Sequence, residues 1–226
     1  MLVRIGITVF PGSNCDRDVH HILNNVLHVD ARYIWYKSTF DDFDCIIIPG
    51  GFTYGDRLRA GAIAAHSTIM SKIMELADDN VPILGICNGF QILVESGILP
   101  GALIVNESLN FICKWMNMIV TNTDTPFTNL YAKNQRISIP IAHGEGRFMI
   151  DNKSLIKIKK NNQVTLEYWK YNPNGSLNSI AAICNEKGNV MGMMPHPERG
   201  SDKDLVPAGY DPSSILIFRS MINYFK

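Results

Sequence analysis

The segment Val81-Pro-Ile-Leu-Gly-Ile-Cys-Asn-Gly-Phe-Gln-Ile-Leu93 places one cysteine between two glycines, where an apolar run gives way to a helix-like pattern. Residues 81–86 are predicted to form a buried strand, and residues 88–96 a helix that ends at Gly97. The stretch from Gly85 to Gly89 thus matches the strand–turn–helix pattern that exposes a nucleophile on a sharp turn. The pattern alone also fits a cysteine that only packs in the core.

The chemistry expected at such a turn explains its residue types. A sharp strand-to-helix turn brings the residues two before and two after the nucleophile into contact, so glycine is favoured at Gly85 and Gly89. The positive end of the following helix favours a thiolate at Cys87. The backbone N–H of Asn88 can point at an oxyanion that forms on a bound carbonyl.

Composition excludes several classes of protein. The 226 residues are 46% hydrophobic and 19% charged, with 21 basic and 21 acidic side chains, so bulk charge favours neither nucleic acid nor an anionic membrane. No two of the five cysteines have the spacing of a CxxC motif, so we expect no metal site or disulfide framework but free thiols in a reducing compartment. The N-terminal apolar run is too short for a membrane helix and is predicted to be a strand, not a signal peptide; the expected location is cytoplasmic.

The order of the predicted elements indicates an α/β fold. Strands alternate with helices over the first hundred residues, and strands predominate afterwards. We therefore expect one domain over residues 1–226, with a mostly parallel sheet, helices on both of its faces and additional antiparallel strands in the second half. The expected strands are 4–10, 31–36, 44–49, 81–86, 115–120, 136–141, 163–169, 180–184 and 190–194.

Four helices are predicted, over residues 15–27, 60–77, 88–96 and 212–224. Ser13 or Asn14 is the expected cap of the first, and Pro212 the expected first residue of the last. The polar stretches 129–134 and 152–162 are predicted to be connectors.

His196 is the expected partner of Cys87. It follows the predicted strand 190–194, so it should lie at the same edge of the sheet as Cys87. Pro195 and Pro197 restrict its backbone, and in an extended segment Glu198 would project to the same side. Cys87, His196 and Glu198 then have the order nucleophile, base and orienter. Two alternatives remain: a rigid Pro-His-Pro turn without catalysis, and His143 as the base.

The glycine-rich loop at 49–55 also follows a predicted strand. Its sequence, Pro-Gly-Gly-Phe-Thr-Tyr-Gly, lacks the patterns of phosphate-binding loops. The N–H of Gly51 or Phe52 is expected to complete an oxyanion hole with that of Asn88. A tight turn without a ligand is the alternative.

These motifs together resemble the class I (triad) glutamine amidotransferases. Gly85-Ile-Cys-Asn-Gly-Phe-Gln91 and His196-Pro-Glu198 carry the resemblance, which is strongest to the glutaminase subunits of phosphoribosylformylglycinamidine synthase. Further similar stretches lie at residues 10–17, 50–56, 58–62, 122–127, 142–148 and 172–176. Relative to the family, the region 150–171 is short and rich in Lys and Asn, and residues 200–211 match weakly.

The resemblance implies a flavodoxin-like fold and a glutaminase. Cys87 would form a glutamyl thioester, His196 would move the protons, and Gln91 would help to hold glutamine. Ammonia would pass to a larger synthetase subunit, PurL, with the small PurS protein present. ATP and Mg²⁺ would bind that partner, which makes formylglycinamidine ribonucleotide in purine synthesis; no cofactor is expected in this chain.

Several residues and two other functions stay open at this point. Arg57, Arg59 and Arg147 either dock a partner, close over glutamine or are solvated. Packing roles are expected for Cys15, Cys45, Cys113 and Cys184. A stand-alone cysteine hydrolase of esters or peptides and a non-catalytic binding module are the competing functions.

Overall fold

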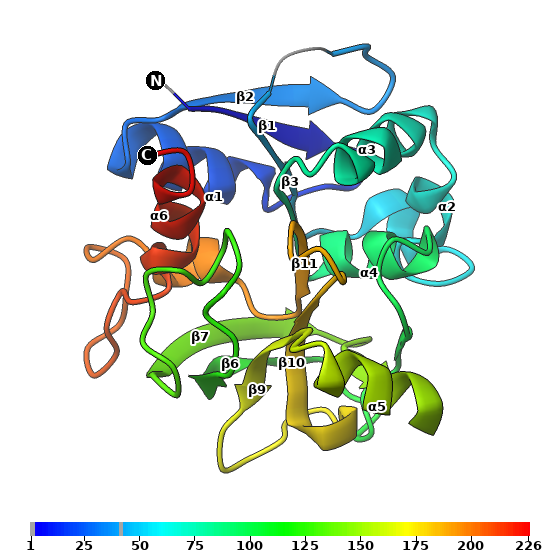
Figure 1. The fold of residues 1–226 in the computed structure, drawn as a ribbon, viewed down its shortest axis with the longest axis vertical. Coiled ribbons are helices and arrows are strands. Elements are labelled where there is room, and N and C mark those ends of the chain that lie inside the picture. Colours follow the sequence, from blue (N-terminus) through cyan, green and yellow to red (C-terminus); the bar gives the residue numbers. More distant parts are fainter. Residues whose placement is uncertain (1–2, 41–42) are drawn as a thin grey trace.

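The computed structural model describes residues 3–40 and 43–226, which build a twisted nine-stranded sheet (Figure 1). From one edge to the other the strand order is β2, β1, β3, β4, β11, β10, β9, β6, β7. Their bounds are β1 Arg4–Val9, β2 Asp30–Trp35, β3 Cys45–Ile48, β4 Ile83–Ile86, β6 Ile112–Val120, β7 Arg136–His143, β9 Val164–Tyr168, β10 Ile180–Cys184 and β11 Val190–Met193. No helix in the described ranges is both long and apolar enough to cross a membrane.

The sheet has a parallel half and an antiparallel half. Strands β2, β1, β3, β4 and β11 pair in parallel, whereas β11, β10, β9, β6 and β7 pair antiparallel. Every residue of β3, β4 and β11 is buried, as expected for strands that are covered on both faces. The expected fold class is confirmed.

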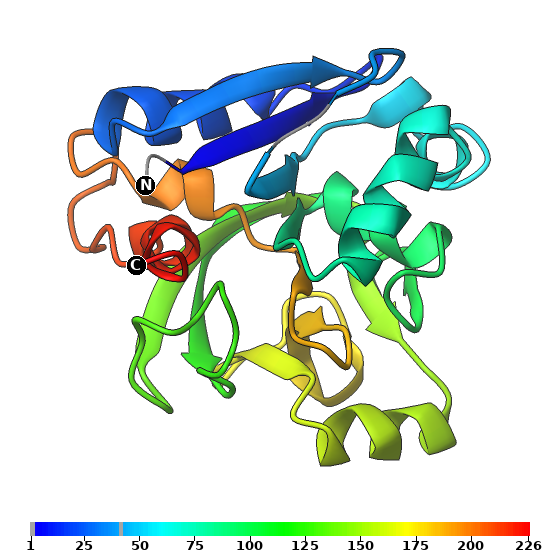
Figure 2. The ribbon, with the colours of Figure 1, turned by 45° about the horizontal axis from the view of Figure 1, so that its top comes forward.

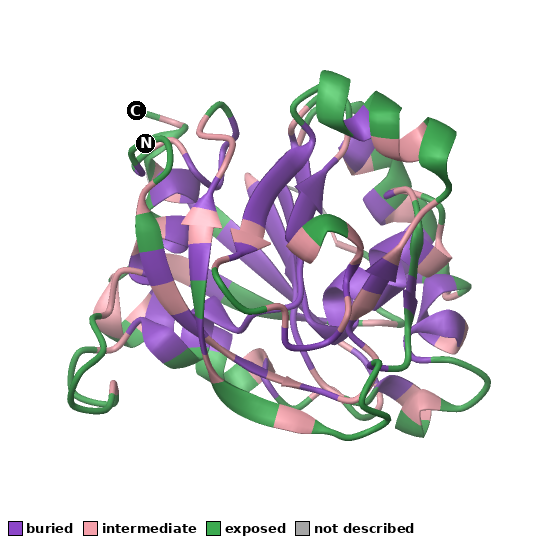
Figure 3. Ribbon diagram, turned by 90° about the horizontal axis from the view of Figure 1, so that it is seen from below, coloured by how far each residue is buried: buried purple, intermediate pink, exposed green. Residues whose placement is uncertain are grey.

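Helices cover both faces of the parallel half (Figures 1 and 2). Helices α1 and α6 lie on one face, and α2, α3 and α4 lie on the other. Their bounds are α1 Asp16–His20, α2 Ala62–Ala65, α3 Thr68–Asp78, α4 Asn88–Glu95 and α6 Ile215–Asn223. Buried residues concentrate on the central strands, and exposed residues on the outer sides of helices and loops (Figure 3).

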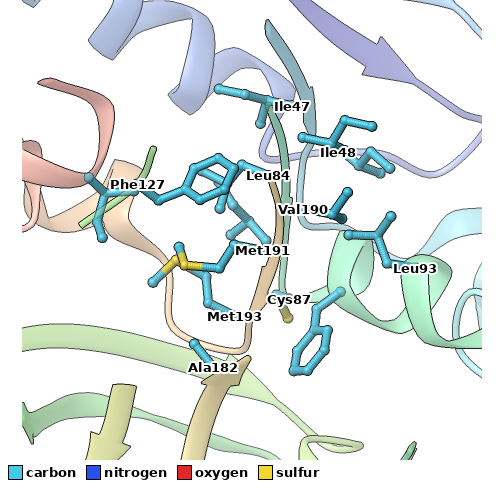
Figure 4. Packing of buried hydrophobic residues seen from close by; sticks show 14 of the residues in the cluster. Ile47, Ile48, Leu84, Cys87, Leu93, Phe127, Ala182, Val190, Met191 and Met193 are labelled. Atoms are coloured by element: carbon cyan, nitrogen blue, oxygen red, sulfur yellow. The ribbon is translucent and has the colours of Figure 1, made fainter. Parts of the chain in front are cut away.

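The pairing of β4 with β11 joins two segments that are 107 residues apart in the chain, as the partners Ile83 and Val190 show. The register sets Ile86 beside Met193, and the N–H of Cys87 donates to the carbonyl of Met193 at 2.7 Å. Figure 4 shows Cys87 at the end of this packed centre, close to Met193. His196 follows Met193 by three residues, so both side chains emerge at the carboxyl ends of neighbouring parallel strands.

The first two predicted helices differ from the structure. The first begins at Asp16, with Cys15 as its N-cap and no side-chain cap, and it continues as a π-helix over His21–Val26. Ser13 does not cap it, because its hydroxyl instead accepts from the N–H of Phe10. The predicted helix 60–77 is divided at Ser67, which is extended and whose hydroxyl donates to the carbonyl of Ala64.

The second half contains elements that the sequence analysis missed. Helix α5, Asn152–Lys160, occupies the stretch predicted to be a connector; the carboxylate of Asp151 caps it by accepting from two N–H groups. The last helix begins at Ile215 instead of Pro212, after a turn over the preceding residues. A small second sheet pairs β5, Ala102–Ile104, with β8, Arg147–Met149.

Candidate functional site

Cys87 occupies a strained turn between β4 and α4. Its φ of 49° and ψ of −102° lie outside the regions that are comfortable for a non-glycine residue. Its side chain is 5% exposed, and its Sγ lies 3.7 Å from the carbonyl oxygen of Ala142. Strain of this kind persists only where the surrounding structure imposes it, and it is typical of functional sites.

The surrounding constraint is the contact of two glycines with the backbone. A Cβ on Gly89 would lie 1.9 Å from the carbonyl oxygen of Ile48, and one on Gly85 would lie 2.7 Å from the carbonyl oxygen of Gly89. Helix α4 therefore approaches β3 and β4 more closely than any side chain at either position would permit. The contact of Gly85 with Gly89 is the one that the sequence analysis expected, whereas the contact of Gly89 with Ile48 of β3 was not expected.

His196 and Glu198 form a buried pair beside Cys87. The imidazole Nδ1 and the carboxylate Oε1 are 2.6 Å apart, and the two residues are 2% and 3% exposed. The N–H of His196 donates to the carbonyl of Pro140 in β7. We expected Glu198 to reach the ring along an extended segment. Instead, Pro197–Gly200 form a 3-10 turn, and this turn brings Glu198 back to His196.

The imidazole of His196 has a pKa that its neighbours raise. Burial by itself would lower the pKa of His196, but the charge of Glu198 and smaller contributions from Cys87 and Cys15 raise it well above its usual value. Its Nε2 is buried and has no hydrogen-bond partner among the described residues. The ring thus has one nitrogen bound to Glu198 and one free for proton transfer close to the thiol.

The loop that follows β3 offers one candidate oxyanion donor. The carbonyl of Gly50 accepts from the N–H groups of Asn14 at 3.5 Å and Cys15 at 3.2 Å. Because C=O and the next N–H point in opposite directions in a trans peptide, the N–H of Gly51 points away from that turn. Phe52 is unsuitable, since its N–H donates to the carbonyl of Gly12.

The second candidate donor is Asn88, the first residue of α4. Its N–H has no partner within the helix, as is general for the first turn. Asn88 follows Cys87 directly, so its N–H belongs to the same turn as the thiol.

Both polar atoms of the Gln91 side-chain amide make hydrogen bonds. Its Oε1 accepts from Asn88 Nδ2 at 2.8 Å, and its Nε2 donates to the carbonyl of Glu145 at 2.6 Å. Asn88 Nδ2 also lies 3.5 Å from Asp56 Oδ1. Burial and the charge of Glu145 raise the pKa of Asp56 to about 6. The sequence analysis gave Asp56 and Glu145 no role of their own, although they lie in the similar stretches 50–56 and 142–148, because the packing of two distant loops brings them to one place.

His143 and two of the three arginines have structural partners. His143 is buried, with Nδ1 3.1 Å from Asn106 Oδ1, and burial together with the charge of His196 lowers its pKa to about 4. Arg59 makes two hydrogen bonds to Glu95. Arg147 donates to the carbonyl of Gly175 at 3.1 Å. Arg57 is exposed.

Two cysteines differ from the expected packing role. Cys113 is exposed on β6. Cys15 is buried, and its Sγ belongs to a group of metal-binding atom types with His196 and Glu198, all within 4.8 Å of one another. Its Sγ also accepts from Arg199 Nη2 at 3.0 Å, so a cation already lies against the sulfur. The similar stretch at residues 10–17 was the only sequence signal that pointed to Cys15.

Comparison with known proteins agrees with this arrangement. The family described as CobB/CobQ-like glutamine amidotransferase domains matches residues 2–225. The chain belongs to this glutamine amidotransferase family. A chain of the PurLQS structure from Thermotoga maritima is 46% identical, with complete coverage of both chains and a TM-score of 0.89.

A more distant structure has the same fold. It is a glutamine amidotransferase from Thermotoga maritima that is 14% identical, with 99% of this chain and 98% of that chain covered and a TM-score of 0.59. At this identity the likeness concerns the fold alone.

The glycine contact in this glutamine amidotransferase yields a test of stability. Helix propensity alone would favour Gly89→Ala by about 1 kcal/mol. The clash with the Ile48 carbonyl should instead destabilise the protein by about 3 kcal/mol or more, measured by urea unfolding. Gly144→Ala is the control, because its added Cβ meets nothing closer than 3.7 Å. Equal stability of the two variants would contradict the contact.

Asp56 yields a test that depends on pH. Its pKa is raised to about 6 in the folded state from the ordinary aspartate value of 3.8, so its contribution to stability is fully present below about pH 4 and is lost as pH rises through 6. Asp56→Asn should therefore stabilise the protein at pH 8, by about 1 kcal/mol after allowance for solvent screening, and less at pH 5. Thermal unfolding at both pH values measures this, with exposed Asp124→Asn as the control. A gain that does not grow with pH would refute the account.

Proposed function

We propose that Cys87, His196 and Glu198 are the catalytic triad of a glutaminase that supplies ammonia to a synthetase, with the whole chain acting as one glutaminase domain. The observation that supports it is the strained thiol of Cys87 beside a buried, charge-paired His196. Membership in the glutamine amidotransferase family makes the side-chain amide of glutamine the bond that is cleaved.

The first half of the reaction forms a thioester. The Cys87 sulfur attacks the amide carbon of glutamine, and the carbonyl oxygen gains negative charge. The N–H groups of Gly51 and Asn88 donate to this oxygen. His196 then gives its proton to the departing nitrogen, which leaves as ammonia. Glu198 stabilises the imidazolium that exists before this transfer.

The second half regenerates the thiol. His196, now neutral, takes a proton from water through Nε2, and the hydroxide attacks the thioester carbon. The sulfur departs as the thiolate beside the reprotonated imidazole, and glutamate leaves with its new carboxyl group, which loses its proton to solvent. The raised pKa of His196 favours this ion pair, because the imidazolium and the thiolate stabilise each other.

Gln91, in the first turn of α4, helps to hold glutamine. Its amide is bonded to Asn88 and to the loop that carries Glu145, so it fixes the wall of the site one turn from Cys87. Each end of the amide keeps the capacity for one further hydrogen bond to glutamine.

The partner is a synthetase of the PurL type, and a PurS protein completes the assembly. The full-length similarity to a chain of the PurLQS structure supports this choice. In this role the chain is the glutaminase subunit of phosphoribosylformylglycinamidine synthase, in purine biosynthesis. ATP and Mg²⁺ act on the synthetase, where formylglycinamide ribonucleotide receives the ammonia.

Removal of the Cys87 thiol should separate synthesis from glutamine from synthesis from free ammonia. Cys87→Ala should abolish synthesis from glutamine and leave synthesis from added ammonium salts unchanged, because only the first requires the thioester. The measurement is product formation by the complex with each nitrogen source. Loss of both activities together would overturn the division of labour.

Loss of His196 should lower glutaminase activity more than loss of the Glu198 carboxylate. His196→Ala should lower kcat/KM for glutaminase by about 10³ or more, because the proton carrier is lost. Glu198→Gln should lower it less, since an amide can still orient the ring. Steady-state glutamate release measures both, and equal losses would contradict the assignment of Glu198 as the orienter.

A further inference from the structure

Cys15 is a second buried thiol at the candidate site, and the mechanism above gives it no task. It is 1% exposed at the start of α1, and its Sγ lies within 4.8 Å of ligand atoms of both His196 and Glu198. Burial raises the pKa of Cys15 against the opposing effects of His196 and Arg199, so the thiol stays protonated and uncharged. Its influence on the site therefore depends on its position.

Arg199 holds this thiol in place. Arg199 Nη2 donates to Cys15 Sγ at 3.0 Å, and Arg199 Nε lies 3.5 Å from Asp18 Oδ2. The thiol itself donates to Asn14 Oδ1 at 3.2 Å. These contacts tie the turn Pro197–Gly200, which carries Glu198, to the first turn of α1.

The same residue also touches the candidate oxyanion loop. The N–H of Cys15 donates to the carbonyl of Gly50. A Cβ added to Gly50 would lie 2.8 Å from His196 Cε1 and 3.1 Å from Cys15 Sγ, so the Gly50 backbone packs against both side chains. The His196 ring, the Cys15 sulfur and the Gly50 backbone thus form one close-packed group, which leaves no room for a side chain at Gly50.

We propose that Cys15, held by Arg199, is a positioning residue of the glutaminase reaction that fixes the imidazole of His196 beside the Gly50–Gly51 peptide. The proposal rests on the proposed role of His196 as the proton carrier. Cys15 does not touch the substrate; it acts through the ring, and Arg199 acts through Cys15.

The groups around the ring set the direction of the expected change with pH. Glu198, Cys87 and Cys15 favour the imidazolium, and the cationic Arg199 donates to the Cys15 sulfur. His143 and Asp18 are also close enough to feel the charge of His196. Loss of the Cys15 contact removes one interaction that favours the imidazolium, so His196 should lose its proton at lower pH.

The test compares Cys15→Ala, Cys15→Ser and the control Cys184→Ala, which removes a buried thiol from β10, away from the site. Glutamate release is assayed with the full-length chain in complex with its synthetase. Cys15→Ala should lower kcat about tenfold with KM within about twofold, and should move the alkaline limb of the kcat/KM profile to lower pH by about half a unit. Cys15→Ser should recover most of kcat, because its hydroxyl still accepts from Arg199.

Three results would overturn the proposal: a Cys15→Ala variant that behaves like Cys184→Ala, a serine variant as impaired as the alanine variant, or a rise in KM with kcat unchanged. If Cys15→Ala does not fold, the variants Arg199→Lys and Arg199→Ala test the proposal in its place. Lysine should retain more kcat than alanine, and a wild-type pH profile for Arg199→Ala would refute the role. Cys87→Ala, run in parallel, reports separately on the triad.

Discussion

The contact of α4 with the ends of β3 and β4 is the constraint on which the site depends. Gly89 touches the carbonyl of Ile48, and the turn between the two glycines forces Cys87 into a positive φ. Any side chain at Gly89 would lift the helix from the sheet. The strain at one residue is therefore imposed by the packing of a whole helix, and the sulfur is held where its own backbone preferences would not place it.

The two halves of the sheet supply different parts of the site. Parallel pairing of β4 with β11 brings the nucleophile and the segment of His196 to one edge. The antiparallel half then closes over them: β7 accepts the N–H of His196 through Pro140, and the carbonyl of Ala142 approaches the sulfur of Cys87. A purely parallel sheet would present the same strand ends without this cover.

The candidate site is almost entirely withdrawn from solvent. Cys87, His196 and Glu198 are each exposed by 5% or less, so the carboxylate and the imidazole interact with little screening by water. Buried charges require partners, and the buried carboxylate of Glu198 finds one in His196. The exposed Arg199 contacts Cys15 and Asp18 from outside this buried pair. This arrangement explains why the pKa of His196 rises despite burial.

The sequence by itself determined the α/β class, the strand–elbow–helix at residues 81–96, and the candidates Cys87, His196 and Glu198, because apolar periodicity, glycine spacing and the flanking prolines act locally. It did not reveal α5, whose polar composition hid a helix capped by Asp151, or the division of α2 from α3 at Ser67. Only the tertiary structure decided that Cys15, Arg199, Asp56 and Glu145 lie at the site. They come from loops far apart in the chain, and the distances between such loops are set by strand order and packing, which no local pattern encodes.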